Sequence, residues 1–289
     1  MSALDDLIAF LAARDDRERE VADFMRSYVL PGTRRDVVVL LHGLTASPPA
    51  WRGVADALHA QGATVVVPRL PLHGHRNRMT TVLRALSADL LDIDMRELIA
   101  AIRPLGGRLT LAGHSLGGTL AVHAGATIPG IDRIVPVAPF LGITRVPQEL
   151  HPPFLRVMRA LPNVMMWWDP IKRERQVPLH GYPRYPLHAL AAGISLADAV
   201  YGEADDLPGV RAIDIVLNTR ESSVSNRAAR RLAKRWRAAG ASVAVHQLHG
   251  LPRSHDIIEP ERPHFARIRN VLVDLFASEH EPADRIHEV

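Results

Sequence analysis

The stretch Arg108–Thr119, RLTLAGHSLGGT, combines the three features that decide the fold of this chain. It begins with an apolar run typical of a buried strand, passes through a small-residue turn and leads into a helix-compatible segment rich in Ala and Leu. The turn contains the pattern G-x-S-x-G, with Ser115 at its centre. A serine at a strained turn projects its hydroxyl above the sheet, and Gly113 and Gly117 let strand and helix approach closely. The stretch therefore predicts a nucleophilic serine at the edge of a sheet.

Short apolar runs alternate with helix-compatible segments on both sides of this stretch. Further buried strands are expected at 36–41, 63–67, 134–138, 213–217 and 242–248, and helices at 3–28, 48–60, 81–103, 226–239 and 262–277. This alternation is typical of α/β proteins, in which helices cover both faces of a mostly parallel, doubly wound sheet. Ligands of such sheets bind at the carboxyl ends of the strands. We therefore expect Ser115, His42–Gly43 and the loops after 217 and 248 to meet at one edge. The polar tail after 278 is expected to fray.

The pattern changes in the middle of the chain, where prolines become frequent. We interpret 141–207 as an insertion, a lid or cap over the active site, between the two parts of a core at 31–140 and 208–289. Residues 1–30 are expected to form an N-terminal helical extension. A bulky apolar run in the insertion consists of Met165, Met166, Trp167 and Trp168. It packs the insertion against the core, lines a substrate pocket, or does both.

Composition excludes several classes of protein. At 289 residues and 47% hydrophobic residues, the chain can bury the core of one large domain with an insertion, or of at most two domains. The absence of cysteine excludes disulfides, thiol chemistry and cysteine-ligated metals. The N-terminus is acidic where a secretory signal is basic, and no stretch approaches the roughly 20 apolar residues of a membrane span. We therefore expect a cytoplasmic protein without stable membrane insertion. The sequence leaves the oligomeric state open.

The densest basic run, RAARRLAKRWR at 227–237, carries Leu232 and Trp236 four residues apart. That spacing indicates a helix with one apolar, docked face and one solvated, charged face. With a net charge of only +4, we expect no nucleic-acid partner, although a polyanion site on this run stays an alternative.

A serine hydroxyl becomes a strong nucleophile only when a base takes its proton and a carboxylate orients that base. Two histidines follow the last predicted strand: His255 lies in the loop before the final helix, and His249 lies nearer the strand end. We favour His255 and keep His249 as the second candidate. Glu221 is the one carboxylate in the loop after strand 213–217. We favour it as the acid; the alternative is that it is an ordinary carboxylate of a surface loop.

Acyl-transfer chemistry also needs backbone N–H donors where negative charge develops. We expect these oxyanion-hole donors to be Leu116, directly after the serine, and Leu44, directly after His42–Gly43. His42 either braces that loop or is an ordinary turn histidine. Together with His114 and the Met/Trp run, His42 is a candidate for the substrate pocket.

His73 and His75 invite a comparison with metal sites. No third ligand at a recognised spacing accompanies them, and the chain has no H-E-x-x-H motif. We therefore expect neither a metal nor any other cofactor.

Five segments in order resemble the successive signatures of the α/β-hydrolase superfamily, and particularly its carboxylesterase, monoacylglycerol-lipase and serine-aminopeptidase-like branch. These segments are LLHGLTASP, PRLPLHGH, LAGHSLGG, NTRESSV and SHDIIEP. The resemblance implies hydrolysis of a small-molecule carboxylic ester through an acyl-serine intermediate, without a cofactor. It also implies the chain order of nucleophile, acid and base that Ser115, Glu221 and His255 follow.

Two departures from that family stand out. The family pattern after the acid strand is G-x-x-D-x-x-V, and here it reads Asn218-x-x-Glu221-x-x-Val224. The family opens with strands where residues 3–28 look helical, so the sheet is expected to be shorter.

The sequence leaves other functions open. The same machinery serves thioesterases, amidases and acyltransferases, and the insertion decides the acyl-chain length, for which we expect short to medium chains. A serine nucleophile argues against the dehalogenases and epoxide hydrolases of this fold, which use aspartate. From another class, a catalytically silent hydrolase fold could act as a binding protein.

Overall fold

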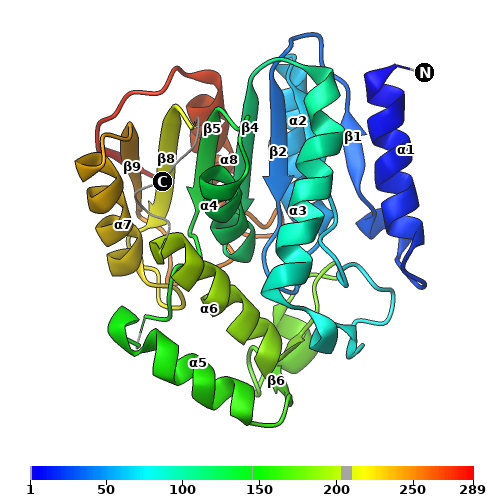
Figure 1. The fold of residues 1–289 in the computed structure, drawn as a ribbon, viewed down its shortest axis with the longest axis vertical. Helices are drawn as coiled ribbons and strands as arrows, with labels where there is room; N and C mark the ends of the chain where they lie inside the picture. The colour runs from blue at the N-terminus through cyan, green and yellow to red at the C-terminus, as the bar shows by residue number, and fades with distance from the viewer. Residues whose placement is uncertain (1, 145, 203–209) are drawn as a thin grey trace.

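The computed structural model describes residues 2–144, 146–202 and 210–289. Its centre is an eight-stranded sheet in the order β1-β3-β2-β4-β5-β8-β9-β10 (Figure 1). The strands are β1 (Tyr28–Leu30), β2 (Val37–Leu41), β3 (Thr64–Val67), β4 (Leu109–His114), β5 (Arg133–Val137), β8 (Ala212–Asn218), β9 (Val243–His249) and β10 (Arg285–Glu288). Only β1 runs antiparallel to its neighbour; the other pairs are parallel. The predicted α/β fold class is confirmed.

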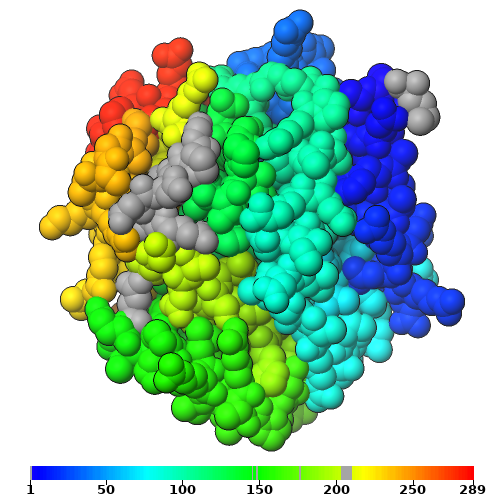
Figure 2. All heavy atoms as spheres, in the orientation of Figure 1, coloured from blue at the N-terminus to red at the C-terminus, as the bar shows by residue number. Residues whose placement is uncertain are grey.

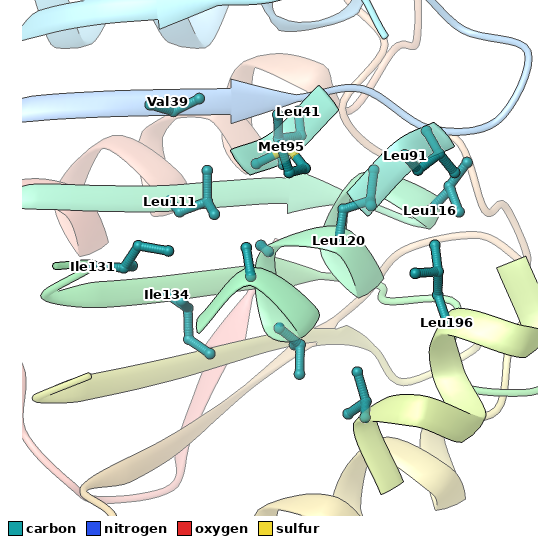
Figure 3. Close-up of a cluster of buried hydrophobic side chains, with 14 of the residues drawn as sticks. Val39, Leu41, Leu91, Met95, Leu111, Leu116, Leu120, Ile131, Ile134 and Leu196 are labelled. Atoms are coloured by element: carbon teal, nitrogen blue, oxygen red, sulfur yellow. The ribbon is translucent and has the colours of Figure 1, made fainter. Parts of the chain in front are cut away.

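Alternate residues of the strands supply apolar side chains to two core layers, one on each face of the sheet. In β2, Val39 and Leu41 belong to one cluster, whereas Val38 and Leu40 belong to the other. A strand that is covered on both faces has no polar side to present, which is why these strands read as continuous apolar runs. Figure 3 shows Val39, Leu41 and Leu111 on neighbouring strands, in the same cluster as Met95 and Leu120 of the helices.

The helices divide between the two faces. The first cluster contains side chains of α1 (Ala3–Asp16), α3 (Ala88–Ile102), α4 (Leu116–Thr127) and α7 (Asn226–Ala238). The second contains side chains of α2 (Arg52–Ala60) and α8 (Phe265–Ala277). In α7, Leu232 and Trp236 are buried while the basic side chains of the run 227–237 are exposed, as predicted for a docked helix. Short 3-10 helices lie at Asp23–Met25, Pro48–Trp51, Val82–Ala85, Arg103–Leu105, Gln148–Leu150 and Arg173–Gln176.

Between β5 and β8 the chain leaves the sheet and forms α5 (His151–Ala160), β6 (Met165–Trp167), β7 (Arg184–Pro186) and α6 (Leu187–Gly202). Strands β6 and β7 pair antiparallel as a separate two-stranded sheet. Figure 1 shows α5, β6 and α6 beyond the arrowhead ends of the central strands, and Figure 2 shows their green atoms filling the lower part of the same face. Residues 145 and 203–207 of the predicted insertion, and residues 208 and 209 of the predicted core, lie outside the described residues.

The N-terminal segment is less helical than predicted. Helix α1 begins at a capping box between Ser2 and Asp5 but ends at Asp16. The buried Asp15 carboxylate accepts hydrogen bonds from the Ser27 N–H at 2.7 Å and from Arg69 Nε at 2.9 Å, which folds the chain back on itself. Strand β1 then adds to the edge of the sheet beside β3. The expectations of a wholly helical extension at 1–30 and a shortened sheet are therefore wrong.

The long helix predicted at 81–103 is interrupted. Leu86 is extended, with ψ 127°, and Ser87 starts α3 by accepting a hydrogen bond from the Leu90 N–H at 3.1 Å. A serine whose hydroxyl bonds the third residue after it is a strong helix N-cap, so it ends one helical segment and begins another.

The C-terminal tail does not fray. Strand β10 pairs parallel with β9, and the Val289 N–H donates to the His249 carbonyl at 3.1 Å. Asp284, just before β10, forms an ion pair with Arg237 of α7. The tail is ordered because it covers the otherwise open edge of β9.

No described helix combines the length and the apolar character that crossing a membrane requires.

Candidate active site

Ser115 lies at a strained turn between β4 and α4. Its φ of 55° and ψ of −117° belong to a region that residues other than glycine rarely adopt. A Cβ at Gly113 would lie 2.2 Å from the Gly117 carbonyl carbon, and a Cβ at Gly117 would lie 2.3 Å from the Leu41 carbonyl oxygen. Neither position tolerates a side chain, so strand and helix meet closely at this turn.

Ser115, His255 and Glu221 form a continuous chain of hydrogen bonds. Ser115 Oγ lies 2.7 Å from His255 Nε2. His255 Nδ1 lies 2.9 Å from Glu221 Oε2. A neutral His255 that carries its proton on Nδ1 donates to the glutamate and accepts from the serine hydroxyl. This arrangement can withdraw the serine proton and stabilise the resulting imidazolium.

The Glu221 side chain is fully buried, at 0% exposed surface, whereas that of His255 is 20% exposed. Glu221 Oε1 accepts hydrogen bonds from the backbone N–H groups of Ser222, at 2.8 Å, and Ser223, at 2.7 Å. Burial raises the pKa of Glu221, but the hydrogen bond and charge of His255 and these N–H donors outweigh it, and the net pKa is lowered. The carboxylate is therefore ionised at neutral pH.

Glu221 has the opposite effect on His255. Burial lowers the pKa of His255, but the hydrogen bond and charge of Glu221 outweigh burial and raise the pKa above its ordinary value. A base with a raised pKa holds a transferred proton more readily, which suits proton abstraction from a serine.

His114 supports the backbone of the His255 loop. Its Nε2–H donates to the His255 carbonyl at 2.9 Å, and the two ring centroids are 4.8 Å apart. Burial, and secondarily the charge of His255, lower the pKa of His114 to about 4. His114 is therefore a neutral donor at physiological pH.

Asn218, the last residue of β8, joins the strand that precedes Glu221 to the loop that carries His255. Its buried Nδ2 donates to the carbonyls of Pro252, at 3.0 Å, and Ser254, at 2.9 Å. Its own backbone carbonyl accepts from Asn226 Nδ2 at 2.7 Å. Sequence reasoning singled out Asn218 only as a departure from the glycine of the family pattern and missed this contact.

The second candidate for the base lies elsewhere. His249 is the last residue of β9, and its Nδ1 lies 3.8 Å from Glu288 Oε1 on β10. Of the two histidines left open by the sequence, His255 is the one that contacts Ser115.

The loop after β2 runs beside Ser115. A Cβ at Gly43 would lie 3.3 Å from the Ser115 Cβ, and Leu44 and Leu116 both line the cavity that contains Ser115. Leu116 is the first residue of α4, where the N–H groups have no acceptor within the helix. The two predicted oxyanion donors are therefore brought to the same cavity wall as the serine.

Two buried histidines brace this loop. His42 Nδ1–H donates to the Gly43 carbonyl at 2.9 Å, and its Nε2 accepts from the Leu70 N–H at 3.0 Å. His73 Nε2 accepts from the Thr45 N–H at 3.2 Å. Burial lowers the pKa of His42 well below its ordinary value and that of His73 to about 4, so both rings are neutral acceptors. Of the two roles left open for His42, the structure favours loop bracing.

A cavity of about 420 Å³ opens at Ser115. Beyond the serine and histidine, its walls include Thr45, Phe140, Ile143, Trp168, Val177, Leu190, Gly193, Val224, Arg253, Asp256 and Glu259. Phe140 and Ile143 follow β5 at the carboxyl edge of the sheet. Because ligands bind at this edge, the sequence could have marked both residues as pocket candidates.

Two of the six predicted pocket residues, His114 and Trp168, lie in the cavity wall. The other four lie outside the cavity wall: His42 is buried beneath the loop, and Met165, Met166 and Trp167 form β6 and pair with β7. The run therefore contributes to the cavity only where strand pairing ends. There the Trp168 Nε1–H donates to Thr45 Oγ1 at 2.9 Å.

His73 and His75 already have partners within the protein. His75 Nε2 lies 3.0 Å from Glu18 Oε2, and His73 Nδ1–H donates to the Pro71 carbonyl at 2.8 Å. Across 2–144, 146–202 and 210–289, the group of three side chains that could hold a metal ion consists of His180, Glu259 and Glu261 instead.

The α/β hydrolases are defined by a strained serine turn on a mostly parallel sheet, with an acid and then a histidine later in the chain. A family model described as the alpha/beta hydrolase family matches residues 38–267. The chain belongs to this family.

Individual relatives match a smaller part of the chain than the family model does. A thermostable monoacylglycerol lipase from a Bacillus species is 31% identical over 100 residues, which is 35% of this chain and 39% of that protein. An uncharacterized protein of Mycobacterium tuberculosis is 30% identical over 121 residues, 42% of this chain and 33% of that protein. The matches thus span only 33–39% of the length of these curated relatives.

Solved structures share the fold over most of the chain. A structure from the metagenome-derived lipolytic enzymes LipS and LipT has a TM-score of 0.68 and 20% identity, covering 90% of this chain and 100% of that one. The monoacylglycerol lipase of Paleococcus ferrophilus has a TM-score of 0.66 and 20% identity, and the match covers 86% of this chain and 96% of that one.

Proposed function

We propose that this protein is a serine hydrolase that cleaves carboxylic esters of small molecules through an acyl-serine intermediate. The observation that carries the proposal is the pair of hydrogen bonds, 2.7 Å from Ser115 to His255 and 2.9 Å from His255 to Glu221, at the wall of a cavity. In this proposal Ser115 is the nucleophile, His255 is the general base and then the general acid, and Glu221 orients His255.

In the acylation step, Ser115 Oγ attacks the ester carbonyl carbon while its proton passes to His255 Nε2. The carbonyl oxygen becomes an oxyanion that accepts hydrogen bonds from the N–H groups of Leu44 and Leu116. When the tetrahedral intermediate collapses, the bond between carbon and alcohol oxygen breaks. His255 Nε2 returns the proton to that oxygen, and the alcohol leaves.

Deacylation repeats these events with water. His255 Nε2 takes a proton from water as its oxygen attacks the acyl carbon, and the same two N–H groups stabilise the second oxyanion. The bond to Ser115 Oγ then breaks and the serine recovers its proton from His255. The products are a carboxylic acid and the regenerated enzyme, so the cycle needs no cofactor.

The cavity favours a short to medium acyl chain. Its volume of about 420 Å³ lies at the lower end of the roughly 300–1,000 Å³ typical of small-molecule sites. Phe140, Ile143, Leu190 and Val224 supply apolar surface that an acyl chain can cover. The similarity to the Bacillus monoacylglycerol lipase supports an ester substrate in general.

We further propose that the insertion predicted at 141–207 is a lid. Two of the contacts that hold it to the loop after β2 are made by Thr45: the Trp168 Nε1–H donates to Thr45 Oγ1 at 2.9 Å, and the Tyr182 N–H donates to the Thr45 carbonyl at 2.7 Å. Both contacts lie next to Leu44, so the position of the insertion is linked to one proposed oxyanion donor.

The proposal is tested by labelling the protein with a fluorophosphonate probe and mapping the labelled peptide, together with turnover of p-nitrophenyl esters from acetate to palmitate. We expect a covalent adduct on Ser115 and a maximum rate at a short to medium chain. An adduct without ester turnover would favour a thioester or amide substrate or acyl transfer. A folded protein that forms no adduct would contradict the proposal and favour a catalytically silent binding protein.

A further inference from the structure

A second group of chemically capable side chains lies beside the proposed active site. His180 belongs to the insertion, whereas Glu259 and Glu261 follow β9 in the loop that also carries His255. One potential ligand atom from each of these three residues lies within 4.8 Å of the others. Glu259 also lines the cavity that contains Ser115.

The distances within this group match those between ligands of one metal ion. His180 Nε2 lies 3.0 Å from Glu259 Oε2 and 3.8 Å from Glu261 Oε1. Two ligands bound at about 2.0–2.1 Å in tetrahedral geometry are roughly 3.3 Å apart, which lies between these two separations.

The two inner members of the group are buried without the hydrogen bonds that buried polar groups normally make. His180 and Glu259 are each only 6% exposed. His180 Nε2 and Glu259 Oε2 face each other at 3.0 Å, as an ion pair when the imidazole is protonated, and neither atom has a further polar partner within hydrogen-bond distance in the described part of the chain. When the imidazole is neutral with its proton on Nδ1, these two facing lone-pair atoms suit a cation that bonds to both at once.

The backbone around His180 is fixed independently of its ring. Ser47 Oγ donates to the His180 carbonyl at 2.6 Å, and the next residues are held by the Tyr182 N–H bond to Thr45. On the other side of the group, the Glu259 carbonyl accepts from the Arg262 N–H at 3.0 Å. The ligand atoms are therefore presented from two anchored segments.

We propose that His180, Glu259 and Glu261 bind one divalent transition-metal cation of the zinc class. One imidazole and two carboxylates form a donor set that zinc accepts, with a fourth position left for water. Because the ligands come from the insertion and from the His255 loop, the bound cation joins these two segments at the rim of the cavity. Its binding stabilises the folded chain, since the site requires both segments in place.

The test is calorimetric titration of the full chain with ZnCl₂ after removal of metals with EDTA, without substrate. We expect saturable uptake of about one equivalent of Zn²⁺ and a rise in Tm. MgCl₂, whose cation demands octahedral oxygen ligands, should give no such uptake. Because no substrate is present, failure of this test leaves the proposed esterase function untouched.

Two variants separate this site from adventitious binding to other histidines. Glu261 is 60% exposed on its side chain, so Glu261→Gln removes a ligand without disturbing the packing, and we expect at least about tenfold weaker Zn²⁺ binding. Glu279→Gln changes an exposed glutamate outside the group and should bind Zn²⁺ like the wild type.

His180→Gln should lose the site in protein whose Tm shows that it is folded. Absorption bands of four- or five-coordinate Co²⁺ in the wild type, lost in Glu261→Gln, would support the same assignment. Absence of saturable Zn²⁺ uptake by the wild type would overturn the proposal, as would equal affinity of the wild type and Glu261→Gln.

Discussion

Asn218 Nδ2 donates a 2.9 Å hydrogen bond to the carbonyl of Ser254, the residue directly before His255. A second bond from the same nitrogen, to the Pro252 carbonyl at 3.0 Å, fixes the loop at two points. The strand that leads to the proposed acid therefore sets the backbone position of the proposed base.

The variants Asn218→Ala and Asn218→Asp test this relationship. Alanine removes both donors, and aspartate places a carboxylate against two carbonyl oxygens. We expect kcat for a p-nitrophenyl ester to fall about 10- to 100-fold in Asn218→Ala, because a displacement of about 1 Å at a catalytic group has that effect. The loss in Asn218→Asp should be larger, while KM changes little. An unchanged kcat in either folded variant would show that the loop is held by other contacts.

Glu221→Gln tests the acid. We expect kcat to fall on the order of 10⁴-fold, as for the orienting carboxylate of related triads, with the fold retained. A rate within tenfold of the wild type would exclude Glu221 from this role.

The pH dependence of kcat/KM tests the effect of Glu221 on the proposed base, His255. Only neutral His255 can take the serine proton, so kcat/KM falls as the pH drops through the pKa of His255. Because Glu221 raises that pKa, the wild-type acid limb should lie above the ordinary value of about 6.5. In Glu221→Gln the effect of burial remains and that of the carboxylate is lost, so the residual acid limb should move to lower pH. A limb at the same pH in both proteins would contradict the assignment.

Trp168 and Trp167 form a matched pair in the insertion. Trp168 lines the cavity and bonds Thr45 through Nε1, whereas Trp167 lies in β6 outside the cavity wall. Trp168→Phe should raise KM several-fold and shift the chain-length preference, measured on the p-nitrophenyl ester series. Trp167→Phe should leave both close to the wild type. Equal effects of the two substitutions would argue against a specific role of Trp168 in the cavity.

Gly117→Ala tests the steric basis of the serine turn. The new Cβ would lie 2.3 Å from the Leu41 carbonyl oxygen, so we expect a loss of about 3 kcal/mol in the free energy of unfolding, measured by urea denaturation. Gly202→Ala is the control, because a Cβ there meets nothing within 4 Å and the stability should change by less than about 1 kcal/mol. Similar values for the two variants would refute the close-approach argument.

The sequence allowed the central strands and the serine turn to be predicted because their signals are local. Continuous apolar runs follow from burial on both faces, and the glycines around Ser115 follow from one close approach of strand and helix. The edges of the fold lacked such signals. Strand β1 depends on Asp15 binding Ser27 and Arg69, and β10 depends on the open edge of β9.

The same distinction applies to the candidate site. Ser115, Glu221 and His255 were selected by their places after three of the predicted strands, and the structure brings them within hydrogen-bond distance. The bond from Asn218 to Ser254 joins residues 36 positions apart, and the cavity wall combines distant side chains such as Phe140 and Leu190. No periodicity in the chain encodes these long-range contacts. Met165, Met166 and Trp167 pair with β7 and lie outside the cavity wall, and an apolar run in the sequence does not reveal that placement.

The most direct test of the central claim is rapid mixing of the protein with a p-nitrophenyl ester, followed by acid quenching and intact-mass measurement. We expect a transient mass increase equal to one acyl group, located on the peptide that contains Ser115, with stoichiometric release of p-nitrophenol. Ser115→Ala should show neither the adduct nor the release while retaining the wild-type Tm. An acyl adduct on another residue, or turnover by Ser115→Ala, would contradict the account.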